Sequence, residues 1–418
     1  MDINTNIFRA YDIRGIAYED LTEEIVSKLG KSLGTSSLNN GENLLIVARD
    51  GRNSSPDMYG WLSEGIKSTG CNVLNIGIVP TPLLYFSTFK LPSSSGVMIT
   101  GSHNPSEYNG FKIVKNRKTI SGEAIQKVKL RILENKFLKG KGSETEKEII
   151  EMYLNELRNN INICRPVKLA IDCGNGAASI LAKEAYESLG CEVKSIYSTL
   201  DGNFPNHHPD PSKPENLKDL IEVVLSKKLE VGLAFDGDAD RLGVVSSKGE
   251  IVYPDMQMIL FSRDVLSRNQ GCKIVFDVKC SKLLSDSISK EGGIPLMSKT
   301  GHSFIKNTIA QESALLGGEM SGHIFFNDKW PGFDDAIYAG ARMLEIISRQ
   351  SEKEDIFLTL PKLVSTPEIN VETTDEDKFK IVEDFKTLAD FPNSKTIEID
   401  GIRVEFKTGW GLLRASNT

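Results

Sequence analysis

The 418-residue chain lacks several features that would assign it to a class at once. It has no run of about 18 apolar residues, which a membrane-spanning helix needs. Its first residues, MDINTNIFRAYDIRG, carry Asp and Arg where a signal peptide would be apolar. Its six cysteines form no CxxC pair, so we expect neither disulfides nor zinc ligands. These absences predict a cytoplasmic protein without a membrane partner.

The chain also lacks an excess of basic residues, and its formal net charge is −7. A general nucleic-acid binder would usually be basic, so we expect no nucleic-acid partner. An anionic small molecule remains possible as a ligand, because a site can be locally positive inside an acidic protein.

Strand, loop and helix patterns alternate and restart along the chain, which is too long for one hydrophobic core. Buried strands followed by polar loops are predicted at LLIVARD (44–50) and SSSGVMITGSHNP (93–105), and a helical stretch over 121–160 ends this unit. The pattern restarts at VKLAIDCGNGAAS (167–179) and at KIVFDVKC (273–280). After Pro361 a charged helix near 375–390 precedes short strands in IEIDGIRVEF and WGLLRASNT.

We therefore predict an α/β protein with three similar α/β domains around a central cleft and a smaller α+β domain at the C-terminal end. No Pro-rich or low-complexity linker separates the domains, which favours packing around a common cleft. The expected domains are 1–147, 148–251, 252–362 and 363–418.

The segment DGDADR places Asp236, Asp238 and Asp240 at alternate positions after an apolar strand. Three carboxylates this close repel one another unless a cation neutralises them, and oxygen ligands suit Mg²⁺. An EF-hand would need Gly and Glu where the chain has Arg241 and Ser247. A plain acidic turn on a hairpin is the alternative, and we favour the metal site.

A second segment, TGSHNP, presents Ser102 at the end of a predicted strand. Gly101 lets the chain turn sharply and Pro105 keeps the residue before it extended, so the hydroxyl can be presented as a nucleophile. A Ser-His pair in a turn is also common as a structural feature. The segment lacks the GxSxG elbow of a Ser/His/Asp hydrolase.

Two further segments are suited to binding a substrate. GEMSGH places Glu319, Ser321 and His323 at alternate positions, where an extended loop would turn them all towards sugar hydroxyls. A buried strand with a satisfied His explains the same pattern. The terminal segment RASNT supplies donors for a phosphate from Arg414, Ser416, Asn417 and Thr418. The alternative for this segment is a frayed end.

Taken together, the motifs resemble the α-D-phosphohexomutase family, and within it the bacterial phosphomannomutase/phosphoglucomutase branch. FRAYDIRG (8–15), GIVPTP (77–82), TGSHNPSEYNGFKI (100–113), DGDADR, KTGHSFIK (299–306), GEMSGH and RASNT occur in family order over essentially the whole chain. TGSHNP and GEMSGH are more similar to this branch than to phosphoglucosamine mutases. In the family, further chain follows the RASNT loop, so the resemblance implies a fourth domain that looks truncated at Thr418.

The resemblance implies an isomerase that interconverts hexose 1-phosphate and hexose 6-phosphate. Ser102 would carry the phosphoryl group, and Mg²⁺ would be bound by one of its oxygens together with Asp236, Asp238 and Asp240. Arg241 would stabilise phosphate charge. Glu319 and Ser321 would hydrogen-bond the sugar O3 and O4 hydroxyls. Mannose and glucose differ only at C2, so both would be substrates.

A hexose 1,6-bisphosphate would be both intermediate and activator, and it would have to turn end for end before returning its other phosphate to Ser102. We expect a monomer whose small-molecule partners are sugar phosphates. The acid/base candidates by motif position are Lys112, His323 and Arg14, with His103 and His302 nearby. A basic lysine would need a depressed pKa, which Arg14 could supply.

Further positions lining the cleft in the family correspond to Tyr11, Lys279, Lys299 and His302. The adjacent pair His207-His208 is predicted to be a loop and no metal site. The rival functions are a phosphoglucosamine mutase, a phosphatase, and an inactive paralogue that binds a sugar bisphosphate. The presence of Ser102, three aspartates and Arg241 argues against an inactive protein.

Overall fold

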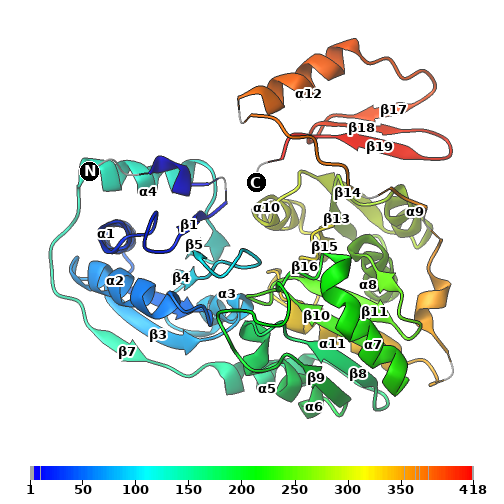
Figure 1. The fold of residues 1–418 in the computed structure, drawn as a ribbon, viewed down its shortest axis with the longest axis horizontal. Helices are drawn as coiled ribbons and strands as arrows, with labels where there is room; N and C mark the ends of the chain where they lie inside the picture. Colours follow the sequence, from blue (N-terminus) through cyan, green and yellow to red (C-terminus); the bar gives the residue numbers. More distant parts are fainter. Residues whose placement is uncertain are drawn as a thin grey trace.

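The computed structural model describes residues 4–9, 11–352, 354–362, 364–366, 368–374 and 376–416. Within these ranges it contains three α/β units and a smaller unit with one helix and a three-stranded sheet (Figure 1). The predicted fold class is confirmed. No helix in the described part of the chain is both long and apolar enough to cross a membrane.

The first unit has a mixed sheet in the order β1-β5-β4-β2-β3-β7, with β6 paired to β5. β4 runs parallel to β2 and antiparallel to β5, so the ends of β4 and β2 point the same way. The strands are β1 (Ile13–Ile16), β2 (Leu44–Arg49), β3 (Asn72–Ile78), β4 (Gly96–Ile99), β5 (Tyr108–Lys115), β6 (Lys118–Thr119) and β7 (Glu144–Glu146). The helices are α1 (Glu23–Asn39), α2 (Ser55–Lys67), α3 (Thr81–Lys90) and α4 (Glu123–Glu134).

The segment 121–160, predicted as a helix-prone stretch, is helical near both of its ends. It contains two helices, α4 and α5 (Ile150–Asn160), and between them β7 pairs in parallel with β3. α4 ends at Asn135, which adopts the left-handed conformation that commonly stops a helix. The next residues, Lys136 to Gly142, include two glycines and no apolar periodicity.

The second unit has the strand order β12-β11-β10-β8-β9 and the third has the order β14-β13-β15-β16. In each, the first strand of the chain pairs with parallel neighbours and the last hairpin is antiparallel. The second unit comprises β8 (Lys168–Asp172), α6 (Ala182–Ser188), β9 (Glu192–Ile196), α7 (Lys218–Lys227), β10 (Val231–Phe235), β11 (Leu242–Ser246) and β12 (Ile251–Val252). The third comprises α8 (Pro254–Arg268), β13 (Lys273–Asp277), α9 (Lys282–Lys290), β14 (Ile294–Ser298), α10 (His302–Glu312), β15 (Leu316–Gly318), β16 (Ile324–Phe326) and α11 (Ala336–Ser348).

The fourth unit consists of α12 (Asp377–Leu388), β17 (Lys395–Ile397), β18 (Ile402–Glu405) and β19 (Trp410–Leu413). Its strands form an antiparallel meander, β17-β18-β19. Figure 1 shows this unit above the third one, on the side of α9 and α10. It contacts the third unit through Arg403, whose Nη1 donates to the carbonyls of Val278 (2.7 Å) and Cys280 (2.6 Å).

Candidate active site

The loop that carries Ser102 follows β4 and is fixed by a buried arginine. Arg52 Nη2 donates to the carbonyls of Ser102 (2.7 Å) and Asn104 (2.6 Å). Arg52 Nη1 donates to those of Pro105 (2.6 Å) and Tyr108 (3.0 Å). One guanidinium therefore donates to four carbonyls between Ser102 and Tyr108, and this favours a single conformation of the loop.

Ser102 itself has a strained backbone, with a φ of 50°. A positive φ is uncommon for a residue with a Cβ and tends to occur at functional positions. The side chain is buried, and its Oγ donates to Asp236 Oδ2 over 3.0 Å and lies 3.2 Å from His103 Nδ1. The hydroxyl is thus directed at the acidic loop of the second unit.

The acidic loop joins β10 to β11 and is folded around Asp236. Asp236 Oδ1 accepts from the backbone N–H groups of Asp240 and Arg241, each over 3.1 Å. Gly237 lets this loop approach the Ser102 loop, because a Cβ at this position would lie 2.3 Å from the Ser102 carbonyl oxygen. The glycine of DGDADR is therefore required by the contact between two domains.

The three aspartates form a group that can hold a metal ion. One carboxylate oxygen from each of Asp236, Asp238 and Asp240 lies within 4.8 Å of the others, and all three residues are buried. Asp238 Oδ1 is buried without a hydrogen-bond partner. An unpaired buried carboxylate oxygen is costly unless a cation is near, and donors that are all oxygen suit a hard divalent ion. The residues therefore fit a metal such as Mg²⁺.

Lys112, on β5, contacts the same cluster. Its Nζ donates to Asp238 Oδ2 over 2.6 Å and to Asp240 Oδ2 over 2.5 Å. Burial lowers the pKa of Lys112, but the two carboxylates more than offset burial, so that this pKa lies well above its usual value. The expectation that Arg14 depresses the pKa of Lys112 is wrong. Arg14 instead donates to Asn104 Oδ1 (2.7 Å) and Asp12 Oδ2 (2.5 Å), and so supports the Ser102 loop.

The loop between β15 and β16 adds the polar groups of the third unit. His323 Nδ1 lies 2.9 Å from both Glu319 Oε2 and Ser321 Oγ, so the three alternate side chains lie together, as the pattern predicts. His323 Nε2 lies 3.2 Å from Asp240 Oδ1. Burial lowers the pKa of His323, but Asp240 and Glu319 raise it to about 9. Arg241 Nε lies 3.4 Å from His323 Nε2, which joins the metal loop to this one.

The other two histidines of the predicted site have pKa values below the usual value and not above it. Burial, followed by the positive charges of Arg241 and Arg14, holds the pKa of His103 well below its usual value. Burial and Lys306 lower the pKa of His302, whose ring stacks on His323 with the ring centroids 5.6 Å apart. The site therefore contains histidines that favour different charge states at the same pH.

The outer residues of the predicted site are more loosely arranged. Lys279 Nζ is paired with Glu368 Oε2 at 2.6 Å, and Lys299 is exposed. Tyr11 Oη donates to the Thr300 carbonyl over 3.3 Å, which joins the first unit to the KTGHS loop. Arg414 and Ser416 follow β19, and Ser416 is exposed. Asn417 and Thr418 lie outside the described residues.

The structure also reveals polar residues that the sequence reasoning did not single out. Thr81, at the start of α3, donates from Oγ1 to Asp238 Oδ2 over 2.5 Å, which gives a role to the GIVPTP motif. Asp334 lies 3.1 Å from His302 Nδ1 and accepts from Lys306 Nζ over 2.8 Å. Arg52 holds the Ser102 loop from a segment, ARDGR, that resembles an ordinary strand end. Only the three-dimensional contacts distinguish these side chains from surface charges.

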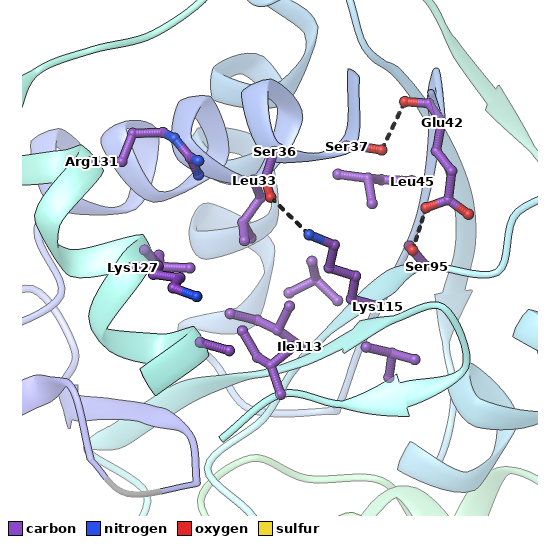
Figure 2. A pocket seen from close by; sticks show the side chains of 15 residues that line it. Leu33, Ser36, Ser37, Glu42, Leu45, Ser95, Ile113, Lys115, Lys127 and Arg131 are labelled. Atoms are coloured by element: carbon purple, nitrogen blue, oxygen red, sulfur yellow. Dashed lines mark hydrogen bonds between the residues drawn. The ribbon is translucent and has the colours of Figure 1, made fainter. Parts of the chain in front are cut away.

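A mostly apolar cavity of the first unit lies away from this site. Its volume is about 140 Å³, and it is enclosed by α1, α4 and strands of the first sheet (Figure 2). Figure 2 shows Lys115 beside Ser36, with Lys127 and Arg131 at one side. None of the predicted site residues lines this cavity.

The chain matches family models within residues 5–362 and known proteins over nearly its whole length. Models of the alpha/beta/alpha domains I, II and III of phosphoglucomutase/phosphomannomutase match residues 5–139, 151–249 and 253–362. A phosphomannomutase/phosphoglucomutase of Pseudomonas aeruginosa is 49% identical over 414 residues, which cover 99% of this chain and 89% of that protein.

Solved structures show the same relationship. A phosphoglucomutase/phosphomannomutase family protein from Burkholderia thailandensis has a TM-score of 0.95 and 42% identity, covering 100% of this chain and 92% of that one. An N-acetylphosphoglucosamine mutase of Aspergillus fumigatus, solved with glucose 1,6-bisphosphate, shares the fold with a TM-score of 0.57 and 13% identity, covering 98% and 92%. The relatives of high identity bear the names of the mannose and glucose branch and not of the glucosamine alternative.

Agreement between the family models, the near full-length relatives and the meeting of the Ser102 loop, the acidic loop and the β15–β16 loop leads to one assignment. The chain belongs to the phosphoglucomutase/phosphomannomutase family of phosphohexomutases, isomerase-class enzymes that move a phosphoryl group between two positions of a hexose.

Proposed function

We propose that the enzyme interconverts the 1- and 6-phosphates of mannose and glucose through a phosphoryl group carried on Ser102. The observation that carries this proposal is the contact of Ser102 Oγ with Asp236 Oδ2 at 3.0 Å, beside a buried cluster of carboxylates. A phosphoryl group on Oγ would add its oxygens to the same cluster, whose Asp238 Oδ1 has no partner.

We propose that Asp236, Asp238 and Asp240 hold Mg²⁺ together with a phosphoryl oxygen on Ser102. When bound, the ion supplies positive charge that stabilises the transition state of phosphoryl transfer. The protein contributes the geometry: Asp236 is fixed by two backbone N–H groups, and Arg52 fixes the Ser102 carbonyl. Neither group has to move before transfer, so the reorganisation cost is small.

In the proposed reaction a free sugar hydroxyl attacks the phosphorus of phospho-Ser102. A new P–O bond to the sugar forms, the bond to Ser102 Oγ breaks, and the hydroxyl proton passes to a base. The product is a hexose 1,6-bisphosphate, which turns over and returns its other phosphoryl group to Ser102. Added bisphosphate activates the enzyme because it can phosphorylate Ser102 in the same way. The acid/base candidates remain Lys112, His323, Arg14 and His103.

Sugar recognition is proposed to depend on Glu319 and Ser321, which would bind O3 and O4. Their close contact with His323 supports this, because the three groups form one polar surface next to Asp240. Recognition through O3 and O4 is compatible with the end-for-end turn of the intermediate. It leaves the configuration at C2 unrecognised. The further proposed substrate-binding residues are Tyr11, Lys279, Lys299 and His302. The RASNT residues Arg414, Ser416, Asn417 and Thr418 are proposed to bind a phosphate.

The proposed groups all come from one chain, which supports a monomer as the active form. We retain domain limits at residues 147, 251 and 362 as proposals, and a cytoplasmic location in keeping with sugar phosphate substrates.

The test is a coupled assay of glucose 1-phosphate to glucose 6-phosphate with added glucose 1,6-bisphosphate and Mg²⁺. We expect comparable turnover with mannose 1-phosphate, loss of turnover in excess chelator, and strongly reduced rates with 3-deoxy and 4-deoxy substrates. The 2-deoxy sugar should remain a substrate. Faster turnover of glucosamine 6-phosphate than of either glucose 1-phosphate or mannose 1-phosphate would contradict the proposal.

A further inference from the structure

We infer that Asp400 is a positioning residue that orients the guanidinium of Arg414 for a substrate phosphate. Asp400 lies in the turn between β17 and β18. Its Oδ2 accepts from Arg414 Nε over 3.2 Å and from the backbone N–H of Thr300, also over 3.2 Å. The side chains of Asp400 and Arg414 are 16% and 14% exposed, so the pair is partly protected from water.

The nitrogen of Arg414 that Asp400 contacts determines the effect of this ion pair. An arginine offers its Nε and two terminal nitrogens in a planar fork, and a phosphate is best bound by the two terminal nitrogens. Asp400 contacts Nε. Among the described residues, no side chain or carbonyl is hydrogen-bonded to Arg414 Nη1 or Nη2. The carboxylate therefore fixes the plane of the guanidinium and leaves its phosphate-binding edge available.

The backbone around Asp400 is built for this contact. Gly401 has a φ of +80°, and a Cβ there would lie 2.2 Å from the Leu413 carbonyl oxygen. A side chain at this position would push β19, and Arg414 with it, away from the turn. Arg403, two residues further on, holds the carbonyls on either side of Lys279 and lies 4.0 Å over the Trp410 ring. Asp400 thus lies in the turn before β18, a strand that Arg403 anchors to the third domain.

The second hydrogen bond of Asp400 reaches Thr300 in the KTGHS loop, which in turn contacts Glu319. Thr300 precedes Gly301, whose N–H donates to Glu319 Oε1 over 2.5 Å. The Thr300 carbonyl accepts from Tyr11 of the first domain. One carboxylate of the fourth domain therefore sets the position of Arg414 relative to the residue proposed to read O3 and O4.

This inference rests on the proposed phosphate role of Arg414. Asp400 does not contact Ser102 or the aspartate cluster, so removing it should change substrate affinity and not phosphoryl transfer. In Asp400→Ala we expect KM for glucose 1-phosphate to rise about tenfold, the worth of one charge-assisted hydrogen bond. We expect kcat to stay within about threefold.

The experiment compares steady-state kinetics of the wild type, Asp400→Ala, Asp400→Asn and the control Asp390→Asn, with melting temperatures for each. Asp390 is exposed on the same domain, so its variant makes the same charge change away from Arg414. Asp400→Asn keeps an acceptor oxygen without charge and should give an intermediate KM. An unchanged KM in both Asp400 variants, or a fall in kcat with KM unaltered, overturns the inference.

A double-mutant cycle with Arg414→Ala separates this inference from the proposed function. Arg414→Ala alone should raise KM, and adding either Asp400 substitution should then raise it by less than about twofold, because the oriented group is gone. Equal effects of the Asp400 substitutions in both backgrounds would refute positioning through Arg414. An unchanged KM in Arg414→Ala alone would instead refute the phosphate role of Arg414. The cycle is measured with Asp400→Ala and with Asp400→Asn, so that the comparison stays valid if Asp400→Ala folds poorly.

Discussion

The first three domains and the fourth are held in place by different forces. The first three share one continuous cluster of buried apolar residues that runs from β2 through α5 to α11. In the described part of 364–416, the buried apolar side chains are Val382, Ile402 and Val404, and none of them belongs to that cluster. The fourth domain is joined to the third by polar contacts of Arg403, Asp400 and Glu368.

Aromatic packing makes the junction of the first three domains rigid. The Trp330 ring stacks on Phe86 with centroids 5.7 Å apart and on Tyr338 at 4.3 Å. Asp335 caps α11 and accepts from Tyr153 Oη (3.0 Å) and Trp330 Nε1 (3.2 Å). Each aromatic side chain buries a large apolar area, so separating these domains would be costly.

This difference matches two demands of the proposed reaction. Phosphoryl transfer needs Ser102 and the aspartates at fixed distances, and a continuous core provides that. Turning the bisphosphate needs a phosphate-binding element that can release and rebind, and polar contacts can exchange with water or phosphate at little net cost. Substitutions in the first three domains should therefore lower kcat, and substitutions in the fourth should raise KM.

The largest effect is expected from Ser102→Ala. Removing the nucleophile should lower turnover by at least about a thousandfold, while the melting temperature changes little, because one hydroxyl is lost. Intact-mass measurement of the wild type should show a fraction heavier by one phosphoryl group, absent from the variant. Retention of that mass shift in the variant would place the phosphoryl group on another residue.

A slightly smaller loss is expected from Asp238→Asn. The amide keeps an oxygen for the Thr81 hydroxyl but removes a charge from the metal cluster, so kcat should fall by roughly a hundredfold or more. Calorimetry should show weaker Mg²⁺ binding. Asp286→Asn, on the exposed face of α9, is the matched control and should bind Mg²⁺ like the wild type. Equal Mg²⁺ affinity in both variants would contradict the metal assignment.

Arg52→Lys tests whether the Ser102 loop of the first domain must be held rigid for phosphoryl transfer. A lysine keeps the charge but cannot reach four carbonyls in one plane, so some of them lose their donors. We expect a loss of about 2–4 kcal/mol in the free energy of unfolding and a fall in kcat with KM nearly unchanged. Urea unfolding and steady-state kinetics measure both. A change in KM alone would mean that the loop is not held rigid by Arg52.

The sequence predicts the strands and motif loops well because each is local. Apolar runs mark β2, β8, β10 and β13, and the polar motifs follow strands as expected. His207-His208 lies in a loop, also as predicted. The partners of each motif could not be predicted, because they come from distant segments. Arg52 lies 50 residues from Ser102 and Thr81 lies 157 residues from Asp238.

Charge states were the least predictable property. The pKa of Lys112 depends on two carboxylates more than 120 residues away, and their attraction outweighs burial. Local sequence offered only Arg14 as a neighbour by motif position, and that suggested the wrong direction. The sign of a pKa shift requires the distances themselves.

Arg403→Met tests the polar contacts that join the fourth domain to the third. The variant loses two carbonyl hydrogen bonds that hold β18 against the third domain but keeps an apolar side chain beside Trp410. We expect KM to rise about three- to tenfold, with Ser102 phosphorylation by glucose 1,6-bisphosphate unaffected in extent. Limited proteolysis should cut the variant first within 364–416. A fall in phosphorylation with an unaltered KM would mean that the fourth domain controls the chemical centre.

The smallest effect concerns pH and lies within the second domain. His207 Nε2 lies 2.9 Å from Asp172 Oδ2, and His207 Nδ1 lies 2.9 Å from the carbonyl oxygen of His208. Both partners are acceptors, so only the protonated ring donates to each. Burial lowers the pKa of His207, but the Asp172 carboxylate outweighs burial and raises it above its usual value.

The sign of the resulting pH dependence follows from that direction. A raised folded-state pKa means that protonated His207 stabilises the fold fully below its unfolded pKa of about 6.5. This contribution is lost as pH rises through the folded-state pKa. The urea midpoint of the wild type should therefore exceed that of His207→Gln by more at about pH 6 than at about pH 8.5. Turnover at neutral pH should be nearly equal, because neither His207 nor Asp172 is hydrogen-bonded to Ser102 or to an aspartate of the metal loop. A midpoint difference that does not vary with pH would show that His207 is neutral in the fold and that its contribution is packing alone.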